Sequence, residues 1–296
     1  MTNQNRKTLC IAALEVLNTC DAHEKALKTR AFSTAWNDGN ITELGKITSI
    51  PDRPARPEKP ELLMPRDMPK RKKAGTDKNK IALLHALSHI ELNAIDLAWD
   101  IIGRYAYLFR SGGQARYAAP SSQDAFELPI DFYTDWLKGA DDEAKHFLML
   151  SDRLNDLNAK YGDLPAHDGL WESATNTADH FPARLAVVPM VLEARGLDVT
   201  PNMIKLMKSQ GDDITADMLQ IIHDDEITHV AAGTIWFKKW CEHHNKDEES
   251  YFQELVTAYF NGTLKKPFNH PSRERAGMIR DWYEPLAEDI KLKGSI

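Results

Sequence analysis

Apolar residues recur at helical spacing along most of this 296-residue chain and divide it into three regions. The apolar run near the start predicts helical structure over residues 6–45, placed to cap the rest of the molecule. Residues 50–70 carry proline at six positions, 51, 54, 57, 60, 65 and 69, which breaks regular structure and predicts an extended surface connector. We therefore expect an N-terminal helical extension over 1–49, a Pro-rich connector over 50–75 and a main domain over 76–296.

The main domain contains four long stretches of helical pattern, at residues 77–104, 129–160, 169–195 and 213–244. Glycine or proline marks the ends of the first three, with Gly196 closing the third. A shorter helix is expected near 201–210, with Thr200 as its cap and Pro201 in its first turn. This pattern predicts an all-α fold in which an antiparallel four-helix bundle is followed by a C-terminal tail that packs over its end.

The chain carries the pattern Asp-Glu-x-x-His twice, at residues 142–146 and 225–229. From the composition, one copy is expected by chance only about 0.06 times, so two copies indicate a function. A glutamate and a histidine three residues apart lie about 60° from each other on a helix, and both side chains reach one point beside it. Glu143 with His146, and Glu226 with His229, are therefore candidate chelating pairs.

Two further glutamates lie inside apolar helical stretches. Glu91 shares a helix face with Leu84, Ser88 and Ile95, and Glu193 ends the run Leu185–Leu192. A buried carboxylate is costly unless it is paired or bound to a metal. Two chelating pairs and two single glutamates, one group on each of four helices, form the ligand set of a di-iron or di-manganese site. The predicted metal ligands are Glu91, Glu143, His146, Glu193, Glu226 and His229.

Charge and ligand type favour two divalent cations in this set. Four carboxylates about 5 Å apart would repel by roughly 3 kcal/mol per pair at an effective dielectric constant near 20, and two divalent ions would cancel their charge. Oxygen ligands with two imidazoles and no thiolate favour iron or manganese over zinc or copper. Asp142 and Asp225 precede the chelating glutamates, and we expect each to accept the free ring N–H of the histidine in the opposite motif.

Each of these assignments has a plainer alternative. The two Glu/His pairs could be solvated surface residues, Glu91 and Glu193 ordinary buried acids, and Asp142 and Asp225 surface acids. His223 could add a third imidazole, although a role outside the ligand set is favoured.

The composition narrows the class of protein. A net charge of −7 argues against a general nucleic-acid binder. No long uncharged apolar stretch or secretory signal is evident, so a cytoplasmic protein that does not enter membranes is expected. The three cysteines lack metal-site spacing and fit free thiols in a reducing compartment.

Several strings of the sequence resemble a known family. They lie at residues 84–97, 193–201, 225–230 and 267–269, and they resemble a bacterial ferritin-like family of unassigned function that carries a C-terminal ferritin-like domain. More remotely, the ligand pattern is similar to di-iron carboxylate oxygenases, among them a tRNA-modifying hydroxylase, hydrocarbon monooxygenases and the ribonucleotide reductase small subunit. The resemblance implies a ferritin-like bundle and a two-metal centre formed by the six residues named above.

Three functions follow as hypotheses. The first is a dinuclear Fe/Fe, Fe/Mn or Mn/Mn oxidoreductase or hydroxylase that uses O₂ with a small-molecule substrate or an electron donor; the resemblance implies that Glu193 and Glu226 shift their binding mode. The second is a metal-handling, ferroxidase or peroxide-detoxifying protein without a specific organic substrate. The third is a non-enzymatic helical binding protein. The residue pattern identifies no catalytic side chain, substrate, physiological metal or oligomeric state.

Overall fold

The structure is a computed structural model that describes residues 7–69, 76–110 and 126–287, and it confirms the all-α class. Every regular element within those residues is helical. The longer helices are α1 (Leu9–Leu17), α2 (Ala22–Asn37), α3 (Asp77–Arg110), α4 (Ile130–Asp156), α7 (Ala194–Ser209), α8 (Asp213–His243) and α9 (Glu248–Tyr259). The shorter ones are η1 (Pro65–Asp67), α5 (Gly169–Asn176), α6 (Phe181–Val187), η2 (Val188–Glu193), α10 (His270–Arg275), α11 (Arg280–Tyr283) and η3 (Glu284–Leu286).

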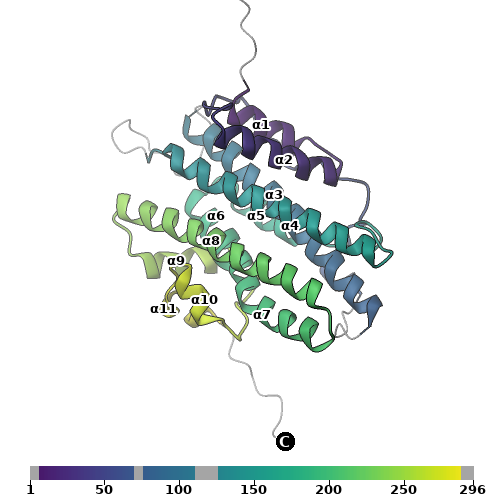
Figure 1. Ribbon diagram of the computed structural model, residues 1–296. Helices are drawn as coiled ribbons and strands as arrows, with labels where there is room; N and C mark the ends of the chain where they lie inside the picture. Colours follow the sequence, from purple (N-terminus) through teal and green to yellow (C-terminus); the bar gives the residue numbers. More distant parts are fainter. Residues whose placement is uncertain (1–6, 70–75, 111–125, 288–296) are drawn as a thin grey trace, which may run out of the picture.

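The long helices lie side by side (Figure 1). Helix α3 packs against α4, α4 against α8, and α8 against α7, with neighbouring helices running in opposite directions. This packing follows from the amphipathic pattern of the helices. In α4, for example, the buried residues recur every three or four positions and form one mostly apolar stripe. Helices α1 and α2 lie along α3 and α4, and α9 to α11 cover the region of α6 to α8.

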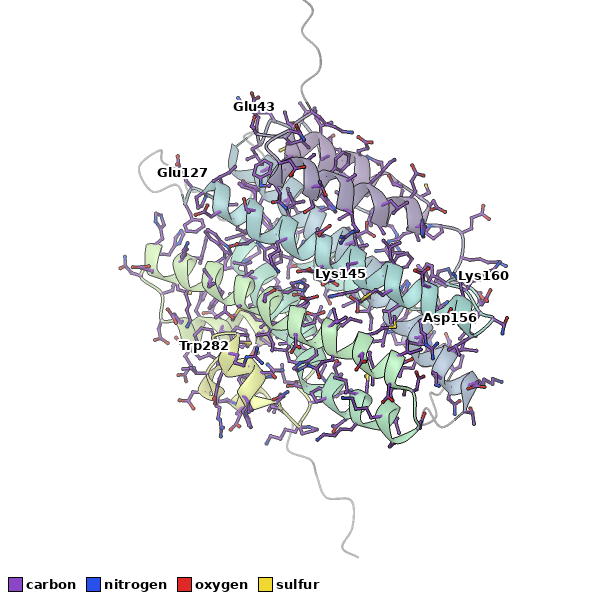
Figure 2. The ribbon with its side chains drawn as sticks, viewed as in Figure 1. Glu43, Glu127, Lys145, Asp156, Lys160 and Trp282 are labelled. Atoms are coloured by element: carbon purple, nitrogen blue, oxygen red, sulfur yellow. The ribbon has the colours of Figure 1, made fainter. Side chains whose placement is uncertain are left out.

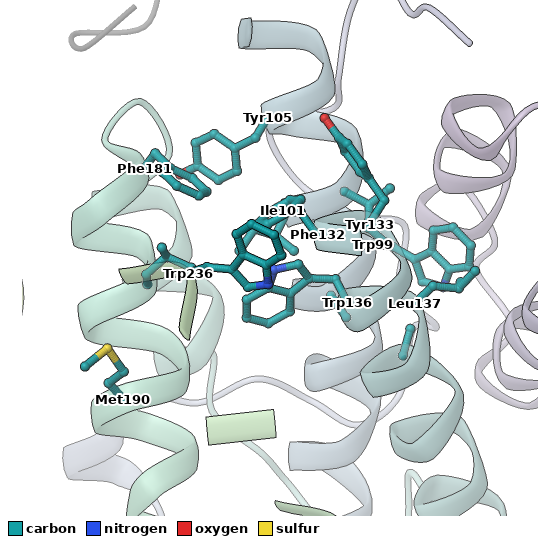
Figure 3. Packing of buried hydrophobic residues seen from close by; sticks show 14 of the residues in the cluster. Trp99, Ile101, Tyr105, Phe132, Tyr133, Trp136, Leu137, Phe181, Met190 and Trp236 are labelled. Atoms are coloured by element: carbon teal, nitrogen blue, oxygen red, sulfur yellow. The ribbon is translucent and has the colours of Figure 1, made fainter. Parts of the chain in front are cut away.

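Aromatic side chains fill one end of the interior (Figure 3). Phe132 of α4 lies with its ring centroid 5.6 Å from that of Phe181 in α6 and 5.3 Å from that of Trp236 in α8. Tyr105 of α3 lies 4.8 Å from Phe181 and donates a hydrogen bond to the carbonyl of Thr177. These rings join α3, α4, α6 and α8 in one core cluster, so the relative positions of these helices are set by large side chains.

The N-terminal region forms helices, as expected, but as two helices and a following irregular segment. Helix α2 begins where the side chain of Asp21 accepts a hydrogen bond from the amide of Glu24 at 2.7 Å. Leu9, Val16 and Ala26 are fully buried and belong to the same core cluster as Trp99 of α3. The extension therefore lies along the flank of the long helices and contributes to their core.

The third predicted helix differs from the expectation. Instead of one helix over 169–195, the chain forms α5, a break at residues 177–180, and then α6, which begins at a cap made by the His180 side chain. The last turns before Glu193 form the π-helix η2, and α7 continues through Gly196 to Ser209. The predicted stop at Gly196 and the separate helix at 201–210 were therefore wrong.

A contact from the C-terminal region explains why α7 passes through a proline. Pro201 has no N–H, so the carbonyl of Leu197 lacks its partner within the helix. The side-chain amide of Asn269 donates to that carbonyl at 3.0 Å. The backbone N–H of Asn269 also donates to Asp198 at 2.9 Å. A residue far away in sequence thus supplies the hydrogen bond that the proline removes.

Helix α3 is apolar enough to raise the question of a membrane. Among the described residues, its segment Asp77–Tyr107 is the one stretch long and apolar enough to span a bilayer, and 67% of its most apolar window is buried inside the protein. Neighbouring helices cover this apolar surface, which is the behaviour of a core helix.

Candidate metal centre

The six predicted ligands come from four elements at the centre of the helical core. Glu91 belongs to α3, Glu143 and His146 to α4, Glu193 to the end of η2, and Glu226 and His229 to α8. Glu91, Glu143 and His146 are at most 3% exposed, and Glu226 and His229 are also buried. The three-residue spacing in α4 and α8 places each glutamate and its histidine on the inward face of the helix.

Three of these residues form a first group. Ligand atoms of Glu91, Glu143 and His146 all lie within 4.8 Å of one another. The Nδ1 atom of His146 is 3.2 Å from Oε2 of Glu91 and 3.5 Å from Oε2 of Glu143. The imidazole of His146 therefore faces both carboxylates through the same nitrogen.

A second group repeats this arrangement. Ligand atoms of Glu143, Glu226 and His229 also lie within 4.8 Å of one another. The Nδ1 atom of His229 is 3.1 Å from Oε1 of Glu143 and 3.6 Å from Oε2 of Glu226. Glu143 thus belongs to both groups and turns one oxygen toward each histidine, so the two groups are adjacent and share a carboxylate.

Glu193 belongs to neither group, but it interacts electrostatically with Glu226 and Glu143. The residue is partly exposed, but its Oε2 atom is buried and has no hydrogen-bond partner among the described residues. Burial, followed by the charges of Glu226 and Glu143, raises its pKa well above the ordinary value. It ends the π-helix η2, a helix type that often occurs at functional sites.

The two aspartates lie against the outer nitrogens of the histidines. Oδ2 of Asp225 is 2.9 Å from Nε2 of His146, and Oδ2 of Asp142 is 3.4 Å from Nε2 of His229. Each aspartate therefore contacts the histidine of the other motif. An Nε2–H that donates to a carboxylate leaves the Nδ1 lone pair directed inward, which is the tautomer a metal ligand needs.

The pKa values of the clustered side chains show how strongly their buried charges interact. Burial and the neighbouring Glu143 raise the pKa of Glu91 well above the ordinary value, and the pKa of Glu226 is raised for the same reasons. Burial would lower the pKa of His146 and His229, but the carboxylates around them raise it well above the ordinary value. Among the four candidate ligand glutamates, only Glu143 has a lowered pKa despite its burial, because both histidines contact it.

Two other buried acids of α3 have basic partners and differ in this respect from the candidate ligands. Asp96 is paired with Lys25 and with Arg56, whose Nε is 2.7 Å away. Asp100 is paired with Arg104 and Arg184, which hold its pKa below the ordinary value in spite of burial. In the part of the chain that the structure describes, no lysine or arginine forms an ion pair with Glu91, Glu143, Glu193 or Glu226. Fold-stabilising acids and candidate ligands are thus distinguished by their partners.

Four of the six residues have a buried polar atom that no good hydrogen bond from the described residues satisfies, which suits metal ligands. Oε2 of Glu143, Glu193 and Glu226 and Nδ1 of His229 are buried and form no hydrogen bond of good geometry among the described residues, although Nδ1 of His229 lies 3.1 Å from Oε1 of Glu143. A buried polar atom without a partner costs about 1–3 kcal/mol, so several in one place point to a missing binding partner. The donors are carboxylate oxygen and imidazole nitrogen, the set that suits iron or manganese. The assignment of these residues as metal ligands stays a prediction.

Sequence reasoning overlooked Lys145 and Lys138. Lys145 donates to Asp225 at 2.6 Å and to Asp142 at 3.0 Å, and Lys138 donates to Asp142 at 2.8 Å. Lys145 stands inside the first Asp-Glu-x-x-His motif, one turn from Asp142, and this position was a usable signal. His223 lies outside both groups, with its Nε2 3.3 Å from the hydroxyl of Ser272.

The fold and the site together define an all-α protein with a buried cluster of glutamates and histidines. The chain belongs to the family described as "Protein of unknown function (DUF455)", whose model matches residues 18–284. It is 36% identical, over 240 residues, to an uncharacterized protein of Haemophilus influenzae, and the match covers 80% of this chain and 78% of that protein. No solved structure matches the chain.

Proposed function

We propose that this protein is a dinuclear iron or manganese carboxylate protein with a ferritin-like antiparallel four-helix bundle, and that it is an O₂-activating oxidoreductase or hydroxylase acting on a small substrate. The observation that supports the proposal is the pair of buried ligand groups that share Glu143 and lack lysine or arginine partners among the described residues. The helices that correspond to the bundle are α3, α4, the α6–η2–α7 segment and α8.

The side chains of the chain have distinct parts in this proposal. Glu91 and His146 would hold one ion, Glu226, His229 and Glu193 the other, and Glu143 would contact both. Bound iron or manganese supplies the one-electron redox steps that no side chain of this site provides. Asp225 and Asp142 hold the two imidazoles in orientation from outside. Trp136 of α4 and Trp236 of α8, the helices that carry the two Glu/His pairs, are buried among other aromatic side chains of the core (Figure 3).

Metal analysis tests the proposal directly. The protein is purified from cells supplied with iron, manganese and zinc, and the metals per chain are counted. The metal-free protein is then titrated anaerobically with Fe(II) and exposed to O₂ while the optical spectrum is recorded. We expect up to two Fe or Mn per chain and an absorption change that requires both Fe(II) and O₂. Stoichiometric zinc alone, or no metal, would contradict the proposal.

The same experiment separates the rival function. A metal-handling or ferroxidase protein would take up and oxidise many iron ions per chain without an organic co-substrate. An oxygenase would stop after one oxidation of its bound pair until electrons are supplied. Repeated additions of Fe(II), with the ratio of Fe oxidised to chain measured after each addition, therefore distinguish the two classes.

A further inference from the structure

A lysine bridges the two aspartates that contact the candidate ligand histidines. The ammonium group of Lys145 donates to Oδ2 of Asp225 at 2.6 Å and to Oδ1 of Asp142 at 3.0 Å. Figure 2 shows Lys145 between α4 and α8, on the face turned toward the reader. Its side chain is 33% exposed, so it stands at the boundary between the buried centre and solvent.

These contacts close a ring around the centre. From Glu143 the ring passes through His146 to Asp225, across Lys145 to Asp142, and through His229 back to the second oxygen of Glu143. The two ligand groups are therefore linked twice. Glu143 joins them inside, and Lys145 joins them outside. Lys138 does not close such a ring, because it contacts Asp142 and Thr228 but not Asp225.

We propose that Lys145 is a positioning residue that couples the two metal sites. It holds Asp225 against His146 and Asp142 against His229, so that a cation bound in one group, by fixing its histidine, also orients the histidine of the other. The inference rests on the proposed function, since it assumes that both groups bind metal. It goes further by assigning cooperative loading to a residue outside the ligand set.

The removal of Lys145 should have opposite effects on metal binding if the residue acts by its charge alone or by positioning the aspartates. A lysine close to a cation site repels the cation, so its removal would strengthen metal binding if charge alone mattered. If Lys145 acts by holding the aspartates, its removal weakens binding at both sites, because both histidines lose their support. Loss of support outside the ligand set typically weakens metal binding about 10–100-fold, and we expect about tenfold per site here, near the lower limit, because Lys145 acts through the aspartates.

Calorimetric titration of the metal-free full-length protein with Mn(II) alone tests the inference. The parent should bind two ions, the second at least as tightly as the first. Lys145→Met and Lys145→Gln should weaken both steps about tenfold and make the second weaker than the first. Lys145→Arg, whose guanidinium can also bridge two carboxylates, should restore parent behaviour. Lys138→Met, the matched control, should affect one step at most.

Thermal unfolding distinguishes positioning from a structural role. The metal-free melting temperature of the Lys145 variants should match that of the parent, while the rise on adding Mn(II) should shrink. Unchanged or tighter Mn(II) binding in both uncharged variants would overturn the inference, as would failure of both to fold. A parent that binds no metal at all would instead overturn the proposed function.

Discussion

At the residue scale, Glu143 differs from the other candidate ligands because each of its carboxylate oxygens faces a different histidine. Oε1 lies 3.1 Å from Nδ1 of His229 and Oε2 lies 3.5 Å from Nδ1 of His146. It is also the one carboxylate of the set with a lowered pKa, whereas burial and neighbouring carboxylates raise the pKa of Glu91, Glu193 and Glu226. A residue that contacts both histidines should matter to both ions.

This difference predicts unequal effects of two isosteric substitutions. Glu143→Gln should abolish stable binding of both ions, because it removes the shared charge. Glu91→Gln should affect mainly the ion next to His146 and leave about one metal per chain. Elemental analysis after Mn(II) loading and desalting measures the difference. Glu172→Gln on the exposed surface of α5 serves as the control and should bind like the parent. Retention of about one metal per chain by both ligand variants would show that Glu143 is not shared.

At the element scale, a proline is accommodated in α7 through a side chain from another part of the chain. Asn269 donates its side-chain N–H to the carbonyl of Leu197, and its side-chain oxygen accepts from the amide of Ser272 at the start of α10. One residue thus completes α7 and caps α10. This arrangement supports the segment that follows Glu193, so it bears on the position of that carboxylate.

A double-mutant cycle tests this account. Asn269→Asp keeps the acceptor that caps α10 but loses the donor to Leu197, and it should lower the free energy of unfolding by about 1–3 kcal/mol. In a Pro201→Ala background the helix has its own N–H for that carbonyl, so the same substitution should cost clearly less. Denaturant unfolding of the parent, the two single variants and the double variant gives the coupling energy between Asn269 and Pro201. Identical costs in both backgrounds would mean that Asn269 does not replace the missing bond.

The same region shows how far sequence reasoning reaches. The inward faces of α3, α4 and α8 were predictable from apolar periodicity, and Glu91 and the two Glu-x-x-His pairs could be picked out because they interrupt or repeat that pattern. The continuation of α7 through Pro201 was not predictable, because its cause is a contact with Asn269, 68 residues later (269 − 201). The bridge made by Lys145 depends on the register between α4 and α8, which a single sequence does not contain.

At the scale of the whole molecule, buried ion pairs attach the N-terminal helices to the core. Lys25 of α2 and Arg56 of the connector both pair with Asp96 of α3, and Lys25 and Asp96 are fully buried. Removing one partner of a buried pair leaves an uncompensated charge. Lys25→Met should therefore lower the free energy of unfolding by about 3 kcal/mol, near the lower limit for such changes because Arg56 remains. Asp96→Asn should cost more than Lys25→Met in denaturant unfolding, because it leaves both Lys25 and Arg56 without their carboxylate, and an equal or smaller cost would contradict this account.

Metal binding and folding should be linked through the raised pKa values of the candidate ligands. Burial, and then the neighbouring carboxylates, raise the pKa values of Glu91, Glu193 and Glu226, and carboxylates raise those of His146 and His229 against the effect of burial, so these groups bind protons more strongly in the folded chain. The stability that such protons contribute is complete below the ordinary pKa values of 4.5 and 6.5, and is lost as the pH rises through the folded-state values. Bound cations replace these protons, so the metal-loaded protein should not lose this stability as the pH rises.

The difference in the free energy of unfolding between the metal-loaded and metal-free protein, the gap measured here, should therefore widen as the pH rises. Thermal and denaturant unfolding with Mn(II) or with a chelator, at several values from pH 6 to pH 9, measure that gap. At free Mn(II) a hundredfold above the dissociation constant, each site adds about 2.7 kcal/mol. Groups outside the centre, such as Lys25 with its lowered pKa, titrate in both forms and cancel in the difference. Glu193→Gln carries no titratable proton there, so its metal-free form should lose less stability with rising pH than the parent. A gap that stays constant or narrows toward pH 9 would show that metal does not replace protons at these residues.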